Sequence, residues 1–95
     1  MNTIRTGIGI DIHRLQKGET LILGGVEIPS QYGLLGHSDG DVLIHSIIDG
    51  FLGAANLGDI GRHFSSNNPE YKGISSVKLL EISFNMVVAE GWKPV

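Results

Sequence analysis

Apolar and polar positions alternate along the start of the chain. Within residues 3–15, TIRTGIGIDIHRL, one parity holds the isoleucines at positions 4, 8, 10 and 12. The other parity holds Gly7, Gly9, Asp11 and His13. Because side chains alternate between the two faces of a strand, this pattern predicts a strand with one apolar face and one face that carries functional groups.

Glycine and proline divide the following residues into short strands. Lys17-Gly18 predicts a turn, and LILGG predicts a short strand that begins at Leu21. A further strand over residues 26–28 follows Gly24-Gly25 and ends before Pro29. Two or three strands are therefore expected before the first helix.

A helical pattern follows the strands. Ser38 is a suitable N-cap, Asp41 lies where a capping box places an acid, and Asp39 adds charge that favours the helix dipole. The predicted helix runs from about residue 39 to about residue 56. Its apolar residues cover a broad stripe, whereas Asp41, His45 and Asp49 recur at helical spacing on another face.

The second half of the sequence predicts a loop and a second helix. Residues 58–73 read as a long loop with one helical turn near 60–64. Ser75 or Ser76 can cap a helix that Gly91 closes. The sequence then stops at WKPV, where another strand is expected. We therefore expect one incomplete domain over residues 1–95, shorter than the fold to which it belongs.

Composition restricts the classes of function. The chain has no cysteine, which excludes disulfides, zinc ribbons and thiol nucleophiles, so any metal needs His and carboxylate ligands. The net charge of -3 and the scattered Lys and Arg argue against a nucleic-acid partner. No apolar run approaches the roughly 20 residues of a membrane span, and the start resembles neither a signal peptide nor a transit peptide. A soluble intracellular protein without a membrane partner is expected.

Histidines and aspartates are concentrated in one part of the sequence. All four histidines and all five aspartates lie between Asp11 and His63. Asp11 and His13 would project from one face of the predicted strand about 7 Å apart, and His45 could supply a third ligand. Three N/O ligands with an open fourth position are typical of a catalytic zinc site. The alternative is a strand-end turn beside a partly buried helix histidine.

The other acids and His37 also have two interpretations. Asp39 and Asp41 either start the helix or face a site, and Asp49 either orients the site or faces solvent. His37 could meet an anion at the helix N-terminus or belong to a loop. GIGID does not match the dinucleotide-binding pattern, because no G-x-G-x-x-G opens a helix after the strand.

Several stretches together resemble one enzyme family. G-x-D-x-H near the start is followed by LGG-x-x-IP, GLLGHSDGDVLIH, DGFLGAANLGDIG and F-x-x-x-x-P-x-x-KG. In this order and spacing, over residues 5–92, they resemble 2-C-methyl-D-erythritol 2,4-cyclodiphosphate synthase. The resemblance implies a phosphorus-oxygen lyase of non-mevalonate isoprenoid (terpenoid) biosynthesis. It would convert 4-diphosphocytidyl-2-C-methyl-D-erythritol 2-phosphate into 2-C-methyl-D-erythritol 2,4-cyclodiphosphate and release CMP.

The resemblance also implies an architecture and a location. The family fold is α+β, a mixed β-sheet with helices packed on one face. Three copies form a homotrimer around a central axis, with active sites between subunits. A bacterial-type member would be cytoplasmic, and a copy trimmed of its transit peptide would be plastidic.

Roles for individual residues follow from the same resemblance. Asp11, His13 and His45 match the ligands of Zn2+ or another divalent cation, which would neutralise charge while the 2-phosphate attacks the β-phosphorus. His37 is expected to stabilise the transition state as the catalytic residue. The implied substrate contacts are Asp11, Ile12, His13, His37, Ser38, Asp59, Ile60, Gly61, Phe64, Ser65, Ser66, Asn67 and Asn68.

Two departures from the family pattern matter. FSSNNP stands where the family reads F-P-D-T-D-P, so Ser66 and Asn68 replace two acids. The family's second half is also missing, with its further strands, its cytosine-binding segment and the Thr-Thr-x-Glu stretch that helps to hold a second ion such as Mg2+ or Mn2+. The alternative function is therefore a non-catalytic, truncated zinc-binding remnant of this enzyme. A third reading, a small oligomerisation module, is disfavoured by the pairing of D-x-H with HSDGD-x-x-x-H.

Overall fold

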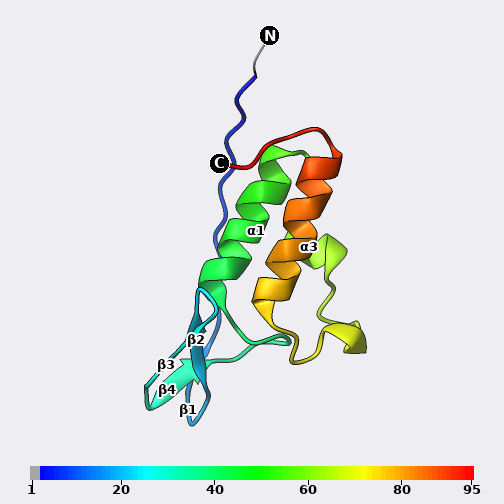
Figure 1. Cartoon of the computed structure of the whole chain (residues 1–95). Coiled ribbons are helices and arrows are strands. Elements are labelled where there is room, and N and C mark those ends of the chain that lie inside the picture. Colours follow the sequence, from blue (N-terminus) through cyan, green and yellow to red (C-terminus); the bar gives the residue numbers. More distant parts are fainter. Residues whose placement is uncertain (1–2) are drawn as a thin grey trace.

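A computed structural model describes residues 3–95 of the chain (Figure 1). Four short strands precede the first helix: β1 (Leu15–Lys17), β2 (Leu21–Leu23), β3 (Val26–Ile28) and β4 (Tyr32–Leu34). The remaining elements are α1 (Val42–Ala54), the short α2 (Ile60–His63), the 3-10 turn η1 (Pro69–Tyr71) and α3 (Ser76–Ala89). The predicted α+β class is confirmed.

The four strands form two antiparallel pairs. β1 pairs with β4, with Leu15 opposite Leu34, and β2 pairs with β3, with Leu21 opposite Ile28. Gly24 and Gly25 have positive φ values of 63° and 79° and form the predicted turn between β2 and β3. Within residues 3–95 the strands therefore make two small ladders in place of the single mixed sheet that the resemblance implies.

The strand predicted over residues 3–15 is wrong for most of its length. Residues 3–14 form an extended segment, part of which lies beside α1 (Figure 1). They have no ladder partner in the described chain, and β1 begins only at Leu15. The alternation of faces is nevertheless present, because the isoleucines at positions 4, 8, 10 and 12 are 72% to 88% exposed. The alternation of apolar and polar residues therefore indicates the two faces of the segment, but a strand also needs a hydrogen-bonded partner strand.

Glycines bring this extended segment against α1. A Cβ added at Gly7 would lie 2.0 Å from the Gly50 carbonyl oxygen, and one added at Gly9 would lie 1.6 Å from the Ser46 carbonyl oxygen. Only a residue without a side chain permits such an approach of two backbones. The glycines therefore hold Asp11 and His13, which follow them on the same face, beside α1.

Helix α1 begins later than predicted, and its N-cap is Asp41 where Ser38 was expected. Gly40 has a φ of 73°, which lies outside the helical region and stops the helix from including Asp39. The Asp41 side chain is fully buried and accepts hydrogen bonds from the backbone N–H groups of Ile44 (3.0 Å), Gly24 (3.0 Å) and Gly25 (2.7 Å). It therefore caps the helix and also fixes the β2–β3 turn to its start.

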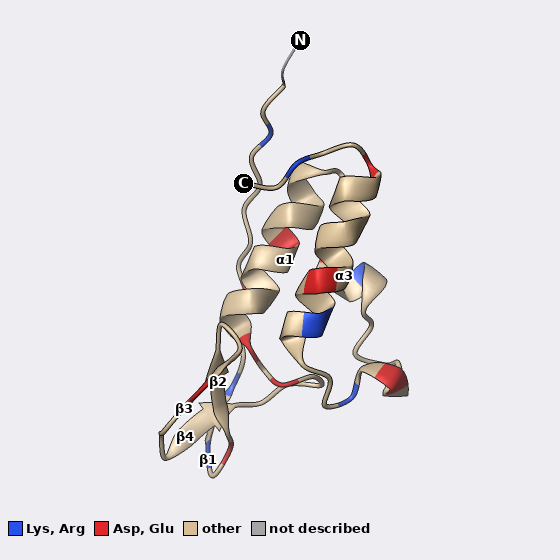
Figure 2. Ribbon diagram, in the orientation of Figure 1, with Lys and Arg blue, Asp and Glu red and all other residues tan. Residues whose placement is uncertain are grey.

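The core lies between α1 and α3, which pack side by side (Figure 1). Its buried cluster is Ile44, Ile48, Leu52 and Leu79. Asp49 is the one charged residue of α1, as Figure 2 illustrates. Such a composition suits a helix that is covered on two sides, here by α3 and by the extended segment. None of the helices described is both long and apolar enough to cross a membrane.

Helix α3 agrees with its prediction. It follows Ser75 as N-cap, although the Ser75 side chain makes no capping hydrogen bond, and it ends shortly before Gly91. The single helical turn predicted near residues 60–64 corresponds to α2.

Gly9→Ala is expected to destabilise the chain by about 1–3 kcal/mol, the usual cost of overpacking. The added methyl would meet only backbone atoms, the Ser46 carbonyl group and the Gly50 nitrogen at 2.9 Å, which cannot move without bending α1. The free energy of unfolding, measured by urea denaturation, tests this. The matched control is Gly53→Ala, in α1 with nothing within 4 Å of its added Cβ, which should stabilise by about 1 kcal/mol through helix propensity. Effects of the same sign at both glycines would contradict the close contact.

Candidate metal centre

Asp11, His13 and His45 meet where the extended segment crosses α1. One possible ligand atom from each residue lies within 4.8 Å of the other two. The Asp11 Oδ2 atom is 2.6 Å from His13 Nε2 and 3.2 Å from His45 Nδ1, and the two ring nitrogens are 3.3 Å apart. The structure thus brings together the three residues that the sequence singled out as ligands.

The hydrogen bond of His13 to the backbone determines which ring nitrogen carries its proton. His13 Nδ1 lies 2.5 Å from the Leu35 carbonyl oxygen, which can only accept, so Nδ1–H is the donor. In the neutral ring the lone pair is then on Nε2. That lone pair faces Asp11 Oδ2.

His45 is oriented by two serines. Its Nε2 lies 2.6 Å from Ser76 Oγ and 3.0 Å from Ser38 Oγ. The Ser76 hydroxyl donates its hydrogen to Asp39, so its oxygen accepts from His45 Nε2–H. The lone pair of neutral His45 is therefore on Nδ1, the nitrogen nearer to Asp11.

Asp11 Oδ2, His13 Nε2 and His45 Nδ1 thus converge, and none of the three atoms carries a proton that it could donate to the others. Asp11 Oδ2 is buried and has no hydrogen-bond partner among the described residues. A buried acceptor without a donor is costly, and a cation between the three atoms removes that cost. One carboxylate oxygen and two imidazole nitrogens form a donor set that suits Zn2+ and leaves a coordination position open. The residues present therefore fit a divalent metal ion.

A pocket of about 190 Å³ opens beside the three residues. The predicted contact residues that line it are Asp11, His13, His37, Ser38, Ile60, Gly61, Phe64 and Ser66. Tyr71 and Leu79 also line it and were not predicted. Tyr71 packs edge-on against Phe64, with ring centroids 5.5 Å apart, a contact that the sequence gives no signal for.

The remaining predicted contact residues lie outside this pocket. Ile12 is 87% exposed on the outer face of the extended segment. Asp59 caps α2 by accepting from the Arg62 N–H at 2.9 Å, and Asn68 caps η1 by accepting from the Glu70 N–H at 3.0 Å. Ser65 accepts from the backbone N–H of Asn67, at 3.2 Å. Their contacts with a substrate stay predictions.

His37 and Asp49 organise the loop that covers the pocket. His37 Nε2 lies 2.8 Å from the Asn68 carbonyl oxygen, and the His37 carbonyl accepts from the Gly73 N–H at 2.7 Å. The Asp49 side chain accepts from the Ile60 N–H at 2.8 Å, so it orients α2. Both residues thus connect the site to residues 60–73.

Asp39 is a carboxylate that is linked to His45 through the hydroxyl of Ser76. Burial raises its pKa, but hydrogen bonds from the Ser76 hydroxyl, the Ser76 N–H and the Asp41 N–H outweigh burial and leave the pKa below its ordinary value. Asp39 is therefore ionised at neutral pH. It serves as acceptor for both donors of Ser76.

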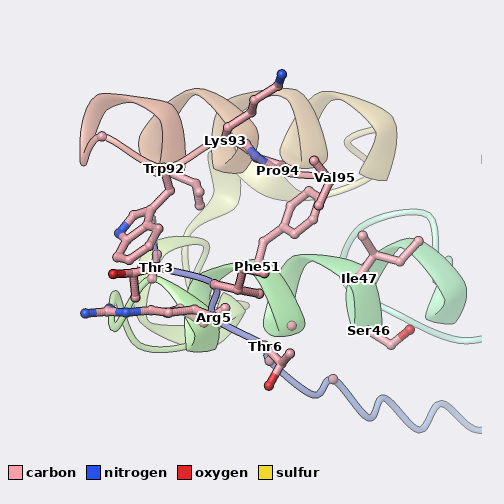
Figure 3. Close-up of a pocket in the computed structure, with 18 residues that line it drawn as sticks. Thr3, Arg5, Thr6, Ser46, Ile47, Phe51, Trp92, Lys93, Pro94 and Val95 are labelled. Carbon is pink, nitrogen blue, oxygen red and sulfur yellow. The ribbon is translucent and has the colours of Figure 1, made fainter. Parts of the chain in front are cut away.

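A larger pocket, of about 1200 Å³, lies between the extended segment, α1 and the residues that follow α3 (Figure 3). The Arg5 guanidinium lies 4.3 Å from the centre of the Trp92 ring there. Neither a histidine nor an aspartate lines this space. We therefore place the chemistry in the smaller pocket, where the titratable groups converge.

Comparison with known proteins gives one consistent result. The YgbB family profile matches residues 4–95. The chain is 60% identical over 89 residues to "2-C-methyl-D-erythritol 2,4-cyclodiphosphate synthase" of Desulforamulus reducens, covering 94% of this chain and 57% of that protein. A protein of the same name from Chlorobaculum tepidum is 55% identical over 92 residues, covering 97% of this chain and 59% of that protein. The chain thus spans little more than half the length of these curated relatives.

Solved structures agree with the sequence matches. A "Structure of 2C-Methyl-D-erythritol-2,4-cyclodiphosphate Synthase" superimposes with a TM-score of 0.86 at 44% identity, over 92% of this chain and 58% of that one. The "Bifunctional IspDF from Campylobacter jejuni" gives a TM-score of 0.82 at 43% identity, over 88% of this chain and 23% of that one. The fold described above is therefore shared with one part of each of these proteins.

Proposed function

The chain belongs to the YgbB family, and on that premise we propose that it carries the metal-binding part of a 2-C-methyl-D-erythritol 2,4-cyclodiphosphate synthase. The observation that carries the proposal is the convergence of Asp11, His13 and His45 around a buried oxygen without a hydrogen-bond donor. The chain spans 57% of the length of its Desulforamulus relative. The activity, substrate and partners of a whole protein are therefore part of the proposal.

The proposed reaction is an intramolecular phosphoryl transfer. An oxygen of the 2-phosphate of 4-diphosphocytidyl-2-C-methyl-D-erythritol 2-phosphate attacks the β-phosphorus. The bond between that phosphorus and the oxygen of CMP breaks. The cyclic diphosphate forms, and CMP is the leaving group. Both reacting groups are anions, so the protein's task is to position them and to neutralise their charge.

Asp11, His13 and His45 would hold the metal ion, Zn2+ or another divalent cation, which when bound supplies Lewis-acid neutralisation of phosphate oxygens. A second ion such as Mg2+ or Mn2+ belongs to the proposal through the family resemblance, which gives it a ligand outside this sequence.

In the proposal, two polar side chains of the pocket bind phosphate. His37 Nε2–H is donated to the Asn68 carbonyl oxygen, so a phosphate would be met by Nδ1, which donates when the ring is doubly protonated. Ser38 Oγ lies 3.0 Å from His45 Nε2 and can accept there, which leaves its own hydrogen for a phosphate oxygen. In the proposal His37 stabilises charge that develops in the transition state, and Ser38 positions the phosphate.

The loop that differs from the family pattern keeps its local structure. Asn68 Oδ1 caps η1 by accepting from the Glu70 N–H, a role that an aspartate could fill equally. Ser66 lines the pocket. The two replacements therefore remove negative charge near the phosphates, and on this ground we expect substrate binding to persist.

A homotrimer with active sites between subunits is also proposed. Its support in this chain is the outer face of the extended segment, where four isoleucines are 72% to 88% exposed. Each isoleucine gains roughly 1.5–3 kcal/mol on burial, so such a row is normally covered by another strand or subunit.

Release of CMP tests the proposed function. The purified chain is incubated with the diphosphocytidyl substrate, Zn2+ and Mg2+, and CMP is measured by chromatography. Release above the protein-free blank that falls by at least about 100-fold in His37→Gln would support the enzyme, since removing one group that stabilises transition-state charge typically costs that much. A folded chain that binds one zinc and releases no CMP would favour the non-catalytic, zinc-binding alternative.

A further inference from the structure

Ser76 connects the start of α3 to the metal centre. It is the first residue of α3 and is fully buried. Its Oγ lies 2.6 Å from His45 Nε2, its N–H donates to Asp39 Oδ2 at 2.8 Å, and its hydroxyl donates to Asp39 Oδ1. The pattern of apolar residues assigned Ser76 only to the beginning of a helix.

The direction of these hydrogen bonds is fixed by Asp39. A carboxylate only accepts, so both donors of Ser76 are directed to it. The Ser76 oxygen keeps its lone pairs for His45 and can only accept from the ring. His45 must therefore carry its proton on Nε2, which leaves the Nδ1 lone pair beside Asp11 Oδ2, 3.2 Å away.

Ser38 cannot fix the ring in this way. Its Oγ lies farther from His45 Nε2, at 3.0 Å compared with 2.6 Å for Ser76. Its hydroxyl can rotate to donate or to accept, because within the described part of the chain its hydrogen bond is to His45 and not to a carboxylate. Ser76 is also the more buried of the two serines.

We propose that Ser76, held by Asp39, is a positioning residue that fixes the tautomer and ring orientation of His45 for metal binding. The inference rests on the metal centre of the proposed function and adds to it a residue from α3, outside the two segments that supply the ligands. Hydrogen-bond partners of metal-binding histidines are worth 10- to 100-fold in metal affinity. The packing of α3 on α1 would therefore affect the affinity of the site for the metal, although α3 contributes no ligand.

The test compares two buried serines of the same helix in the full chain. Ser76→Ala removes the acceptor of His45, whereas the control Ser83→Ala removes a hydroxyl that is also fully buried but donates to the Leu79 carbonyl at 2.8 Å. Zinc affinity is measured by competition with a chelator. We expect a loss of about 10- to 100-fold for Ser76→Ala and little change for Ser83→Ala. An equal loss in both variants would overturn the proposal, because it would reflect the loss of a buried hydroxyl in general.

A second measurement reads the tautomer directly. Long-range 1H–15N NMR of the metal-free chain should show the proton of His45 on Nε2 in the parent chain and in Ser83→Ala, and a mixture of tautomers in Ser76→Ala. If Ser76→Ala keeps the pure Nε2–H form and its zinc affinity, the proposal is wrong. A parent chain that binds no zinc would refute the proposed metal centre, while the NMR spectra would still decide whether Ser76 sets the tautomer.

Asp39→Asn keeps the inference testable if Ser76→Ala does not fold. The two donors of Ser76 are directed to different oxygens of Asp39, and asparagine replaces one of these oxygens by an NH2 group, which cannot accept. One Ser76 donor therefore loses its acceptor, and the hydroxyl is the donor that can rotate away. We expect a smaller loss of zinc affinity than in Ser76→Ala, together with partial loss of the Nε2–H form. Parental affinity and a parental tautomer in Asp39→Asn would overturn the role assigned to Asp39.

Discussion

Replacing His45 by alanine is expected to abolish stoichiometric zinc binding. His45 is 7% exposed and is the one ligand that α1 contributes, so the variant retains only Asp11 and His13 from the extended segment. We expect affinity to fall by more than about 100-fold, since even the hydrogen-bond partners of such ligands are worth up to that amount. Zinc per chain after gel filtration, measured by atomic absorption, gives the answer.

The control for His45→Ala is another histidine of the same chain. The Nε2 atom of His63 lies 2.6 Å from the Leu57 carbonyl oxygen, and among residues 3–95 His63 belongs to no group of converging ligands. His63→Ala should retain one zinc per chain. Zinc at 100 times its Kd should also stabilise the parent chain by about 2.7 kcal/mol and leave His45→Ala unchanged. One tightly bound zinc per chain in His45→Ala would refute the site.

Asp41→Ala is expected to be the most destabilising of the substitutions considered. It removes the fully buried carboxylate that accepts from the backbone N–H groups of Gly24, Gly25 and Ile44, of which only Ile44 is itself a buried residue. The lost N-cap costs about 1 kcal/mol, and the two partly buried hydrogen bonds of the turn cost about 0.5–1.5 kcal/mol each, so we expect a total loss of about 2–4 kcal/mol. Urea denaturation followed by circular dichroism measures it.

Asp49→Ala is the matched control for Asp41→Ala. Asp49 lies on the same helix, is only partly buried and accepts one hydrogen bond, from the Ile60 N–H at 2.8 Å. Its replacement should cost about 1 kcal/mol. If Asp41→Ala costs no more than Asp49→Ala, the assignment of Asp41 as the joint between turn and helix is wrong.

The features that the sequence predicted correctly are those set by neighbours along the chain. Periodic apolar residues located α1 and α3, and the Gly24-Gly25 pair located the β2–β3 turn. The shared parity of Asp11 and His13 placed both on one face, because side-chain direction follows from the local backbone.

The features that the sequence missed depend on contacts between distant segments. Ser38 was predicted as the N-cap, whereas the cap is Asp41, whose carboxylate also accepts from Gly24 and Gly25, 17 and 16 positions away. The role of Ser76 was missed because its contact with His45 joins residues 31 positions apart. The extended segment was assigned as a strand because its alternation says nothing about a partner for its backbone.

The contact between His13 and His45 spans 32 positions of the sequence. A metal bound between them would close a loop of that length, for which the chain-entropy model of a cross-link gives roughly 4 kcal/mol, with the metal in the place of a disulfide. The chain contains no cysteine, so a disulfide cannot supply such a cross-link. Unlike a disulfide, a metal cross-link depends on the concentration of available zinc and does not depend on the redox state of the compartment. When zinc is scarce, the fraction of the chain that is folded would therefore fall before the chemistry of the site is affected.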